Sequence, residues 1–89
     1  MKPKMYTFFS DPGHAWLKVP RAEIHDLGIR STISHYSYQK GAFVYLEEDC
    51  DAPKFIRAKE ARGELVTFHE RNANRSSKIR SYDSYKVEV

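Results

Sequence analysis

The sequence has little of what builds a cross-linked, metal-bound or membrane-spanning protein. Its 89 residues include one cysteine, Cys50. A single cysteine excludes an intramolecular disulfide framework and a cysteine-rich zinc site, and it fits a reducing compartment. Every apolar run falls far short of the roughly 18 residues that cross a bilayer. We therefore expect no membrane-spanning segment.

A secretory leader and a metal motif are also missing. Residues 1–4 are Met-Lys-Pro-Lys, and no apolar segment follows them as a signal peptide requires. The four histidines show no paired spacing such as His-x-x-x-His, which zinc sites use. We therefore expect a cytoplasmic protein that holds no metal and no cofactor.

No pattern of catalytic residues stands out. A helix N-terminus would lower the pKa of the Cys50 thiol, but the carboxylates that flank it in sequence oppose a thiolate. Asp11 and His14 lie across a Ser-Asp-Pro-Gly-His segment, where they could orient each other for acid–base chemistry. Turn chemistry explains the same Asp-Pro-Gly pattern without a site. We therefore expect that the chain is not an enzyme.

The chain does contain enough apolar and aromatic material for one modest core. Hydrophobic residues make up 40% of the chain and aromatic residues 13%, so rings must supply much of the core volume. The length predicts a single domain over residues 1–89. A net charge of +3 is too small to indicate nucleic-acid binding, so the distribution of the charges matters more than their sum.

The hydrophobic pattern predicts strands and two short helices. The predicted strands are residues 4–9, 14–19, the two arms of a central hairpin within 33–46, residues 64–70 and, at the edge, 85–89. The predicted helices are residues 20–27 and 51–62, with Asp51 as a capping residue and glycines at both C-terminal ends. The order β-β-α-β-β-α-β-(β) predicts an α+β fold: one two-layer domain with a mainly antiparallel sheet and two short helices on the same face.

The central hairpin allows two registers around its glycine, Gly41. A two-residue loop of Lys40 and Gly41 places Tyr38 opposite Phe43 and Tyr36 opposite Tyr45, which forms a cluster of four rings. A three-residue loop moves the tyrosines opposite Ala42 and Val44 instead. We favour the aromatic register, because Ala42, Val44 and Leu46 then form one apolar row that faces the core.

The aromatic residues of this hairpin give the first candidate binding surface. If the aliphatic row faces the core, the rings lie on the opposite face of the sheet, which helices on one side leave open. Exposed tyrosine and tryptophan clusters are typical anchors of protein interfaces. The candidate residues are Trp16, Tyr36, Tyr38, Phe43 and Tyr45. The alternative is that the rings form the core and the aliphatic row lies outside.

Two charged segments give further candidates. Residues 47–51 carry four carboxylates, Glu47, Glu48, Asp49 and Asp51, which could meet the dipole of the following helix, bind a basic protein surface or hold a hard cation. Residues 71–82 contain four cations, a tyrosine and no acid. They could bind phosphates and bases, face an acidic protein surface or form plain solvated surface. The candidate nucleic-acid contacts are Arg71, Arg75, Lys78, Arg80 and Tyr82.

Three segments of the chain resemble short, largely uncharacterised proteins encoded by tailed phages and prophages. The segments are Phe-Ser-Asp-Pro-Gly-His-Ala-Trp-Leu-Lys-Val-Pro (9–20), Ser-Tyr-Gln-Lys-Gly-Ala-Phe-Val-Tyr-Leu-Glu-Glu-Asp-Cys-Asp (37–51) and Arg-Ser-Ser-Lys-Ile-Arg-Ser-Tyr (75–82). The resemblance covers about residues 8–82 and brings no catalytic residue with it. It implies a bacterial cytoplasm during infection, where small phage proteins often bind and inhibit host machinery such as CRISPR–Cas complexes.

The leading hypothesis is a small, non-enzymatic phage-type accessory protein that binds and blocks a host protein or a protein–nucleic-acid complex. An anti-CRISPR-like inhibitor of host defence is its most concrete form. It would use Trp16, the hairpin rings and the carboxylates of Glu47, Glu48 and Asp49. The first alternative is a small nucleic-acid-binding protein that uses the basic segment 71–82. The second is a metal-dependent enzyme built on the acidic segment and a histidine.

Overall fold

The computed structural model describes residues 4–87. They form six strands, two α-helices and two short 3-10 helices. In chain order these are β1 (Lys4–Ser10), β2 (Ala15–Pro20), α1 (Arg21–Asp26), η1 (Arg30–Thr32), β3 (Tyr38–Lys40), β4 (Phe43–Glu47), α2 (Ala52–Ala61), β5 (Val66–Asn72), η2 (Lys78–Ser81) and β6 (Asp83–Ser84).

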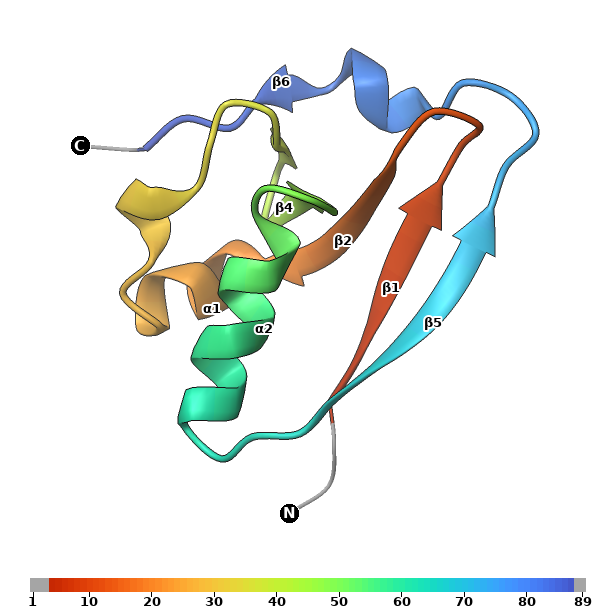
Figure 1. The fold of residues 1–89 in the computed structure, drawn as a ribbon. Helices are drawn as coiled ribbons and strands as arrows, with labels where there is room; N and C mark the ends of the chain where they lie inside the picture. Colours follow the sequence, from red (N-terminus) through yellow and green to blue (C-terminus); the bar gives the residue numbers. More distant parts are fainter. Residues whose placement is uncertain (1–3, 88–89) are drawn as a thin grey trace.

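The strands form one mixed sheet in the order β5-β1-β2-β4-β3-β6, and both α-helices lie on the same face of it (Figure 1). This arrangement confirms the predicted α+β fold with two layers. All neighbouring strands are antiparallel except β1 and β5, which pair in parallel over seven positions. The parallel pair arises because α2 carries the chain across the sheet from β4 to the edge beyond β1, as Figure 1 shows.

The helices form where local sequence signals predict them. Pro20 has an extended conformation just before α1, where the fixed φ of proline suits a helix start. Gly63 has a φ of +75° just after α2, so it takes the left-handed conformation that ends many helices. Asp51 precedes α2, but its side chain forms no capping hydrogen bond with the helix. The prediction that Asp51 caps α2 is therefore wrong, and its carboxylate has another role.

The main core lies between the sheet and the helices. Its side chains alternate along β2 and β4, and they meet Ile24 of α1 and Phe55 of α2. Phe55 is fully buried, and its ring meets the ring of Tyr6 edge to face with 5.2 Å between centroids. Val44 and Leu46 are also fully buried here, as predicted, whereas Ala42, the third residue of the predicted aliphatic row, is exposed in the turn. This confirms which face of the hairpin is the core.

The register of the hairpin differs from both predicted registers. Tyr38 pairs with Tyr45, and Lys40 pairs with Phe43, so the two-residue loop consists of Gly41 and Ala42. Gly41 has a φ of +58° at the first loop position, where a type II′ turn requires it. The shift from the favoured register is two residues, so the side chains that remain in the two strands keep the predicted face, whereas Ala42 moves into the turn.

The reason for this register lies outside the hairpin. The hydroxyl group of Ser37 accepts a hydrogen bond of 2.9 Å from the amide of Glu47 and donates one of 2.5 Å to Asp51. These bonds fix the start of β3 beside the end of β4. Tyr36 is consequently left outside the strand, with its ring stacked against His35 at 4.5 Å between centroids. Tertiary hydrogen bonds therefore decide a register that ring pairing alone would set differently.

The C-terminal segment also differs from the prediction. The edge strand is Asp83–Ser84, whereas residues 85–87 of the predicted strand 85–89 are irregular and residues 88 and 89 lie outside the described residues. Tyr85 is buried in the main core, and its hydroxyl donates a hydrogen bond of 2.7 Å to the carbonyl of Arg30. The sequence pattern predicted this segment wrongly because the buried side chain of Tyr85, and not an alternating strand, holds the segment in place.

A second, smaller hydrophobic cluster lies on the helix-free face of the sheet. It consists of Trp16, Tyr45 and Ile79, with Phe9, Tyr38 and Tyr82 packed around them. Ile79 belongs to η2, which covers this part of the sheet and has no counterpart in the sequence prediction. The helix-free face is therefore only partly open.

Candidate functional site

An open cleft of about 520 Å³ lies at one end of the helix-free face, and we call it the hairpin cleft. Segments far apart in the chain meet there: the end of the first hairpin, the loop before β3, the turn before α2, and η2 with β6. Its lining residues are His14, Trp16, His35, Tyr36, Tyr38, Glu47, Asp49, Cys50, Arg80 and Ser84. The cleft thus combines rings, carboxylates, a thiol and a guanidinium group.

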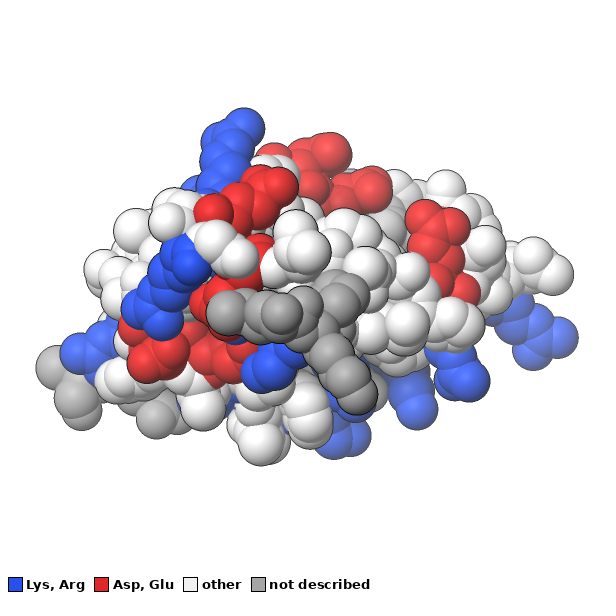
Figure 2. Space-filling model, turned by 90° about the horizontal axis from the view of Figure 1, so that it is seen from below, with Lys and Arg blue, Asp and Glu red and all other residues white. Residues whose placement is uncertain are grey.

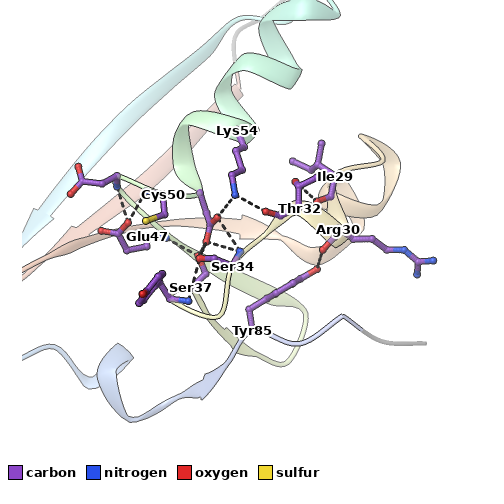
Figure 3. Close-up of polar contacts among 12 residues, drawn as sticks. Ile29, Arg30, Thr32, Ser34, Ser37, Glu47, Cys50, Lys54 and Tyr85 are labelled. Atoms are coloured by element: carbon purple, nitrogen blue, oxygen red, sulfur yellow. Dashed lines mark hydrogen bonds and ion pairs between the residues drawn. The ribbon is translucent and has the colours of Figure 1, made fainter.

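Asp51 holds the loop that forms one wall of the cleft. Its carboxylate is fully buried and accepts hydrogen bonds from the Ser34 amide and hydroxyl and from the Ser37 hydroxyl. Lys54 forms an ion pair with it at 3.0 Å. In Figure 3 the side chains of Ser34, Ser37 and Lys54 converge on this point from the loop and the helix. Asp51 therefore joins the start of α2 to residues 34–37.

These contacts determine the ionisation of Asp51. Burial on its own raises the pKa of the carboxyl group, but the hydrogen bonds from Ser34, Ser37 and Lys54 outweigh it and hold the pKa below its ordinary value. The group is therefore a structural carboxylate at neutral pH. Because all its bonds are internal, Asp51 contributes to a binding surface only by fixing the loop.

Glu47 and Cys50 form the turn between β4 and α2. One oxygen of Glu47 accepts hydrogen bonds from the amides of Asp49 at 2.9 Å and Cys50 at 2.7 Å. A hydrogen bond to Glu47, then burial and the nearby carboxylates, raise the pKa of the exposed Cys50 thiol. The thiol therefore stays protonated at neutral pH, which disfavours a nucleophilic role.

The acidic segment does not assemble a cation site. Among residues 4–87, no three His, Cys, Asp or Glu side chains are grouped so that they could hold a metal ion. Glu47 is buried and occupied by the turn, whereas Glu48 and Asp49 are exposed. Of the three predicted protein-binding carboxylates, Glu47 and Asp49 line the cleft and Glu48 does not.

Arg80, another lining residue of the cleft, is held in place by Asp11. Two nitrogens of the guanidinium group bond the two carboxylate oxygens at 2.6 and 2.8 Å. Asp11 also accepts bonds from the amides of Gly13, His14 and Ser77. Arg80 first, and these amides after it, hold the pKa of Asp11 well below its usual range. The turn expected at residues 10–14 therefore also anchors η2 to the sheet.

The predicted aromatic surface is divided by the fold. Trp16 is 2% exposed and Tyr45 is 8% exposed, because η2 and Tyr82 cover them. The expectation that these two rings are exposed is wrong, although their face is the predicted one. Tyr36 is 60% exposed at the mouth of the cleft, and Tyr38 is half-buried in its wall. Phe43 is exposed outside the cleft.

The predicted nucleic-acid residues do not act as one group. Arg80 is bound to Asp11, and its guanidinium carbon lies 5.2 Å from the ring centroid of Trp16. Tyr82 is half-buried, with its ring 5.1 Å from that of Tyr45. Arg71, Arg75 and Lys78 are exposed, on β5, on the following loop and at the start of η2. Arg80 and Tyr82 thus hold η2 on the sheet.

Sequence reasoning missed several residues that shape this region. Ser34 and Ser37 lie in the first arm of the predicted hairpin, and sequence reasoning assigned no role to either. His35 looked like an isolated histidine, yet it lines the cleft beside Tyr36. The roles of the two serines depend on contacts with Asp51, which lies 14 positions from Ser37 and 17 from Ser34, and no local pattern reveals such contacts.

No family model gave a significant match to the chain, and neither did any curated protein or solved structure. The resemblance to phage-encoded proteins therefore stays a prediction.

None of the helices formed by residues 4–87 combines the length and the apolar character needed to cross a membrane.

Proposed function

We propose that this chain is a small, non-enzymatic binding protein that blocks a host macromolecular complex, and that the hairpin cleft is its main contact surface. The observation that supports this proposal is that residues selected independently as protein-binding candidates meet in this cleft. Five of the eight residues selected as protein-binding candidates line the one cleft: Trp16, Tyr36, Tyr38, Glu47 and Asp49. They come from separate segments of the chain, so their meeting reflects the fold and not their order in sequence.

The chemistry of the cleft suits a protein partner. Tyr36 supplies an exposed ring at the rim, which is the type of side chain that carries much of the binding energy in protein interfaces. Asp49 adds an exposed carboxylate that favours a basic partner surface. The loop beneath Tyr36 is held by the buried Asp51 network, so the ring is presented with little entropy to lose on binding.

The blocking role and the cytoplasm of an infected bacterium are parts of the same proposal. The small size and the resemblance to phage-encoded proteins support them. A protein with this surface would act by steric or electrostatic occlusion of its partner. An anti-CRISPR-like inhibitor of host defence is the form that we propose to test first.

The test is a quantitative pull-down from bacterial lysate with tagged protein and a cleft variant. We expect the wild-type chain to recover a partner in stoichiometric amount. The double variant Tyr36→Ser, Asp49→Lys removes the exposed ring and reverses the charge, and it should reduce recovery at least about tenfold, as the loss of an interface hot spot does.

A matched control variant carries the same number and type of substitutions at positions outside the cleft. Met5 is 68% exposed, and Glu60 is an exposed acid on α2, so Met5→Ser, Glu60→Lys should retain the partner. Equal loss in both double variants, or no stoichiometric partner at all, would contradict the proposal.

The blocking role needs a functional readout. Cells with an active CRISPR–Cas system should regain sensitivity to a targeted phage when they express the wild-type chain. The cleft variant should leave them resistant at the same expression level. Full resistance in both strains would rule out this form of inhibition while leaving the binding proposal to the pull-down.

A further inference from the structure

The helix-free face carries a set of cations that is separate from the hairpin cleft. The strand pairing shows which side chains share this face. Lys18 of β2 lies between Thr7 of β1 and Tyr45 of β4 in one row across the sheet. In a neighbouring row Lys40 of β3 lies beside Phe43. Arg71 of β5 lies beside Phe9 in a third row, so cations reach from one end of the face to the other.

These cations differ from most of those on the helix side in their partners. Around the helices, ion pairs join Lys59 to Glu23, Lys54 to Asp51 and Arg62 to Asp26. Among residues 4–87, by contrast, no carboxylate forms an ion pair with the cations of the helix-free face and its flanking loop. These cations are Lys18, Lys40, Arg71, Arg75 and Lys78.

Figure 2 shows part of this charge distribution. The helices, which face the viewer in Figure 1, lie uppermost in this view, where acidic side chains lie together with basic ones. Basic side chains project along the lower margin, on the side of the helix-free face. Two acids near this face are engaged, since Glu47 binds amides of its own turn and Asp11 binds Arg80, whereas the exposed Asp49 lies in the hairpin cleft at one end of the face. The net charge of +3 therefore conceals a group of cations on this face that have no ion-pair partner within residues 4–87.

Aromatic rings position two of these cations. The ammonium nitrogen of Lys18 lies 4.2 Å from the ring centroid of Phe43, and that of Lys40 lies 4.7 Å from the ring centroid of Tyr82. A cation–π contact does not use the hydrogens of an ammonium group as a carboxylate would. Both groups can therefore still donate hydrogen bonds to phosphate oxygens.

We propose that the helix-free face binds a single-stranded nucleic acid. Lys18, Lys40 and Arg71 contact its phosphates, and the exposed ring of Phe43 stacks on a base. A groove or face with spaced cations and interleaved rings is the surface that binds single strands without sequence preference. This inference does not depend on the hairpin cleft or on its protein partner.

The shape of the face favours a single strand over a duplex. The five strands from β5 to β3 span about 19 Å at a spacing of about 4.8 Å. The major groove of B-DNA is only about 12 Å wide and admits a helix or a two-stranded ribbon. A broad sheet face cannot enter it, whereas a flexible single strand can follow the three rows of side chains.

The test is fluorescence anisotropy with labelled oligothymidine and oligouridine of about 20 nucleotides, which exceeds the usual site size. Three phosphate contacts predict that the logarithm of the affinity falls with the logarithm of the salt concentration with a slope of about −2. The variant Lys40→Glu, Arg71→Glu should weaken binding at low salt at least about tenfold and make that slope shallower by about 1.4. Phe43→Ser should weaken binding about fivefold or more and change the slope by no more than about 0.7, the share of Lys18, which this ring positions.

A control with the same change in net charge locates the effect. Arg57 lies on α2 and Arg62 directly follows it, so Arg57→Glu, Arg62→Glu should stay within about twofold of wild-type affinity. Circular dichroism confirms that each variant is folded, and Lys40→Gln, Arg71→Gln replaces the charge reversal if it is not. The proposal is overturned by the absence of binding at low salt, by equal losses in the control, or by equal affinity for duplex of the same sequence. It is also overturned if the variant Lys40→Glu, Arg71→Glu loses the protein partner but binds the oligonucleotides as tightly as the wild-type chain.

Discussion

The two faces of the sheet use different means to bury the same strands. On the helix side, Ile24 and Phe55 of the helices meet a continuous aliphatic row, and most of the nearby cations are paired with acids. On the other side, a small cluster around Trp16 is covered by η2 and Tyr82. Arg80 of η2 is bound to Asp11, but among residues 4–87 the other cations of this face form no ion pair with an acid. Stability is therefore concentrated on one face, and surface charge that a ligand can use is concentrated on the other.

The polar networks of the two faces also differ in what they hold in place. Burial alone would lower the pKa of Lys59. The hydrogen bond to Glu23 and its negative charge outweigh burial and raise this pKa, so the lysine stays charged within the helix layer. Burial and the same carboxylate raise the pKa of Tyr6 to about 12. Asp11 instead holds an exposed turn against η2. A network inside a core fixes packing, whereas a network at the rim fixes the position of one surface segment.

The largest expected effect is the loss of the helix-side core. Phe55→Ala removes a fully buried ring and should lower the free energy of unfolding by about 3–5 kcal/mol. Small domains have only about 5–15 kcal/mol in total, so much of the stability is lost. Denaturant unfolding followed by circular dichroism measures it. A loss below about 1 kcal/mol would contradict a core concentrated on this face.

The next effect concerns the buried Asp51 network. Asp51→Ala leaves the Ser34 amide and the Ser37 hydroxyl without their acceptor, which should cost about 2–4 kcal/mol. Hydrogen exchange should rise first at residues 34–37, since this loop loses its anchor. Exchange that rises evenly along the chain would speak against a local role.

Truncation of Ile79 in η2 should lower the free energy of unfolding by less than the loss of Asp51 does. Ile79→Ala creates a cavity beneath η2, and we expect a loss of about 2 kcal/mol, because a short surface segment can relax toward the sheet. The fluorescence of Trp16, the single tryptophan, should shift to longer wavelength as water reaches the ring. An unshifted spectrum would mean that η2 is not what shields Trp16.

Acid should weaken the helix layer through Asp51. Its pKa is held below the ordinary value of 3.8, so the folded state binds this proton less readily than the unfolded state. The resulting stabilisation is complete well above that value and is lost as the pH falls through it and then through the lowered pKa of the folded state. Stability measured against pH should fall less steeply in Asp51→Asn. Parallel curves for the two proteins would contradict this assignment.

The smallest effect belongs to an exposed ion pair on the helix side. Arg62 and Asp26 meet at 2.8 Å, but both side chains remain largely in solvent. Arg62→Ala should change the free energy of unfolding by less than about 1 kcal/mol, and added salt should reduce the difference further. A larger loss would show that ion pairs at the surface contribute to the contrast between the faces.

Much of the fold could be predicted from the sequence because local signals agree with the tertiary structure. Alternation placed Val44 and Leu46 in the core, and proline and glycine marked the ends of both helices. The hairpin register could not be predicted in the same way. Ring pairing favoured one register, but the hydroxyl of Ser37, bound to Asp51 and to the Glu47 amide, selects another.

Only part of the candidate site could be predicted, because contacts between distant residues decide the rest. The tyrosines and acids of residues 36–49 were identified because such side chains gather at interfaces. Their division between cleft, core and open face depends on η2, whose position is fixed by the bond between Arg80 and Asp11, 69 residues apart. A basic segment looks the same in sequence whether its cations face solvent or an internal acid.

The amino-acid sequence by itself determined the fold class, the face on which the hairpin buries its aliphatic row, and the ends of both helices. These follow from side-chain periodicity and from backbone preferences, which act over a few residues. Only the tertiary structure decided the register, the burial of Trp16 and which cations lack an acidic partner. Each of these depends on contacts between distant residues, and such contacts exist only once the chain has folded.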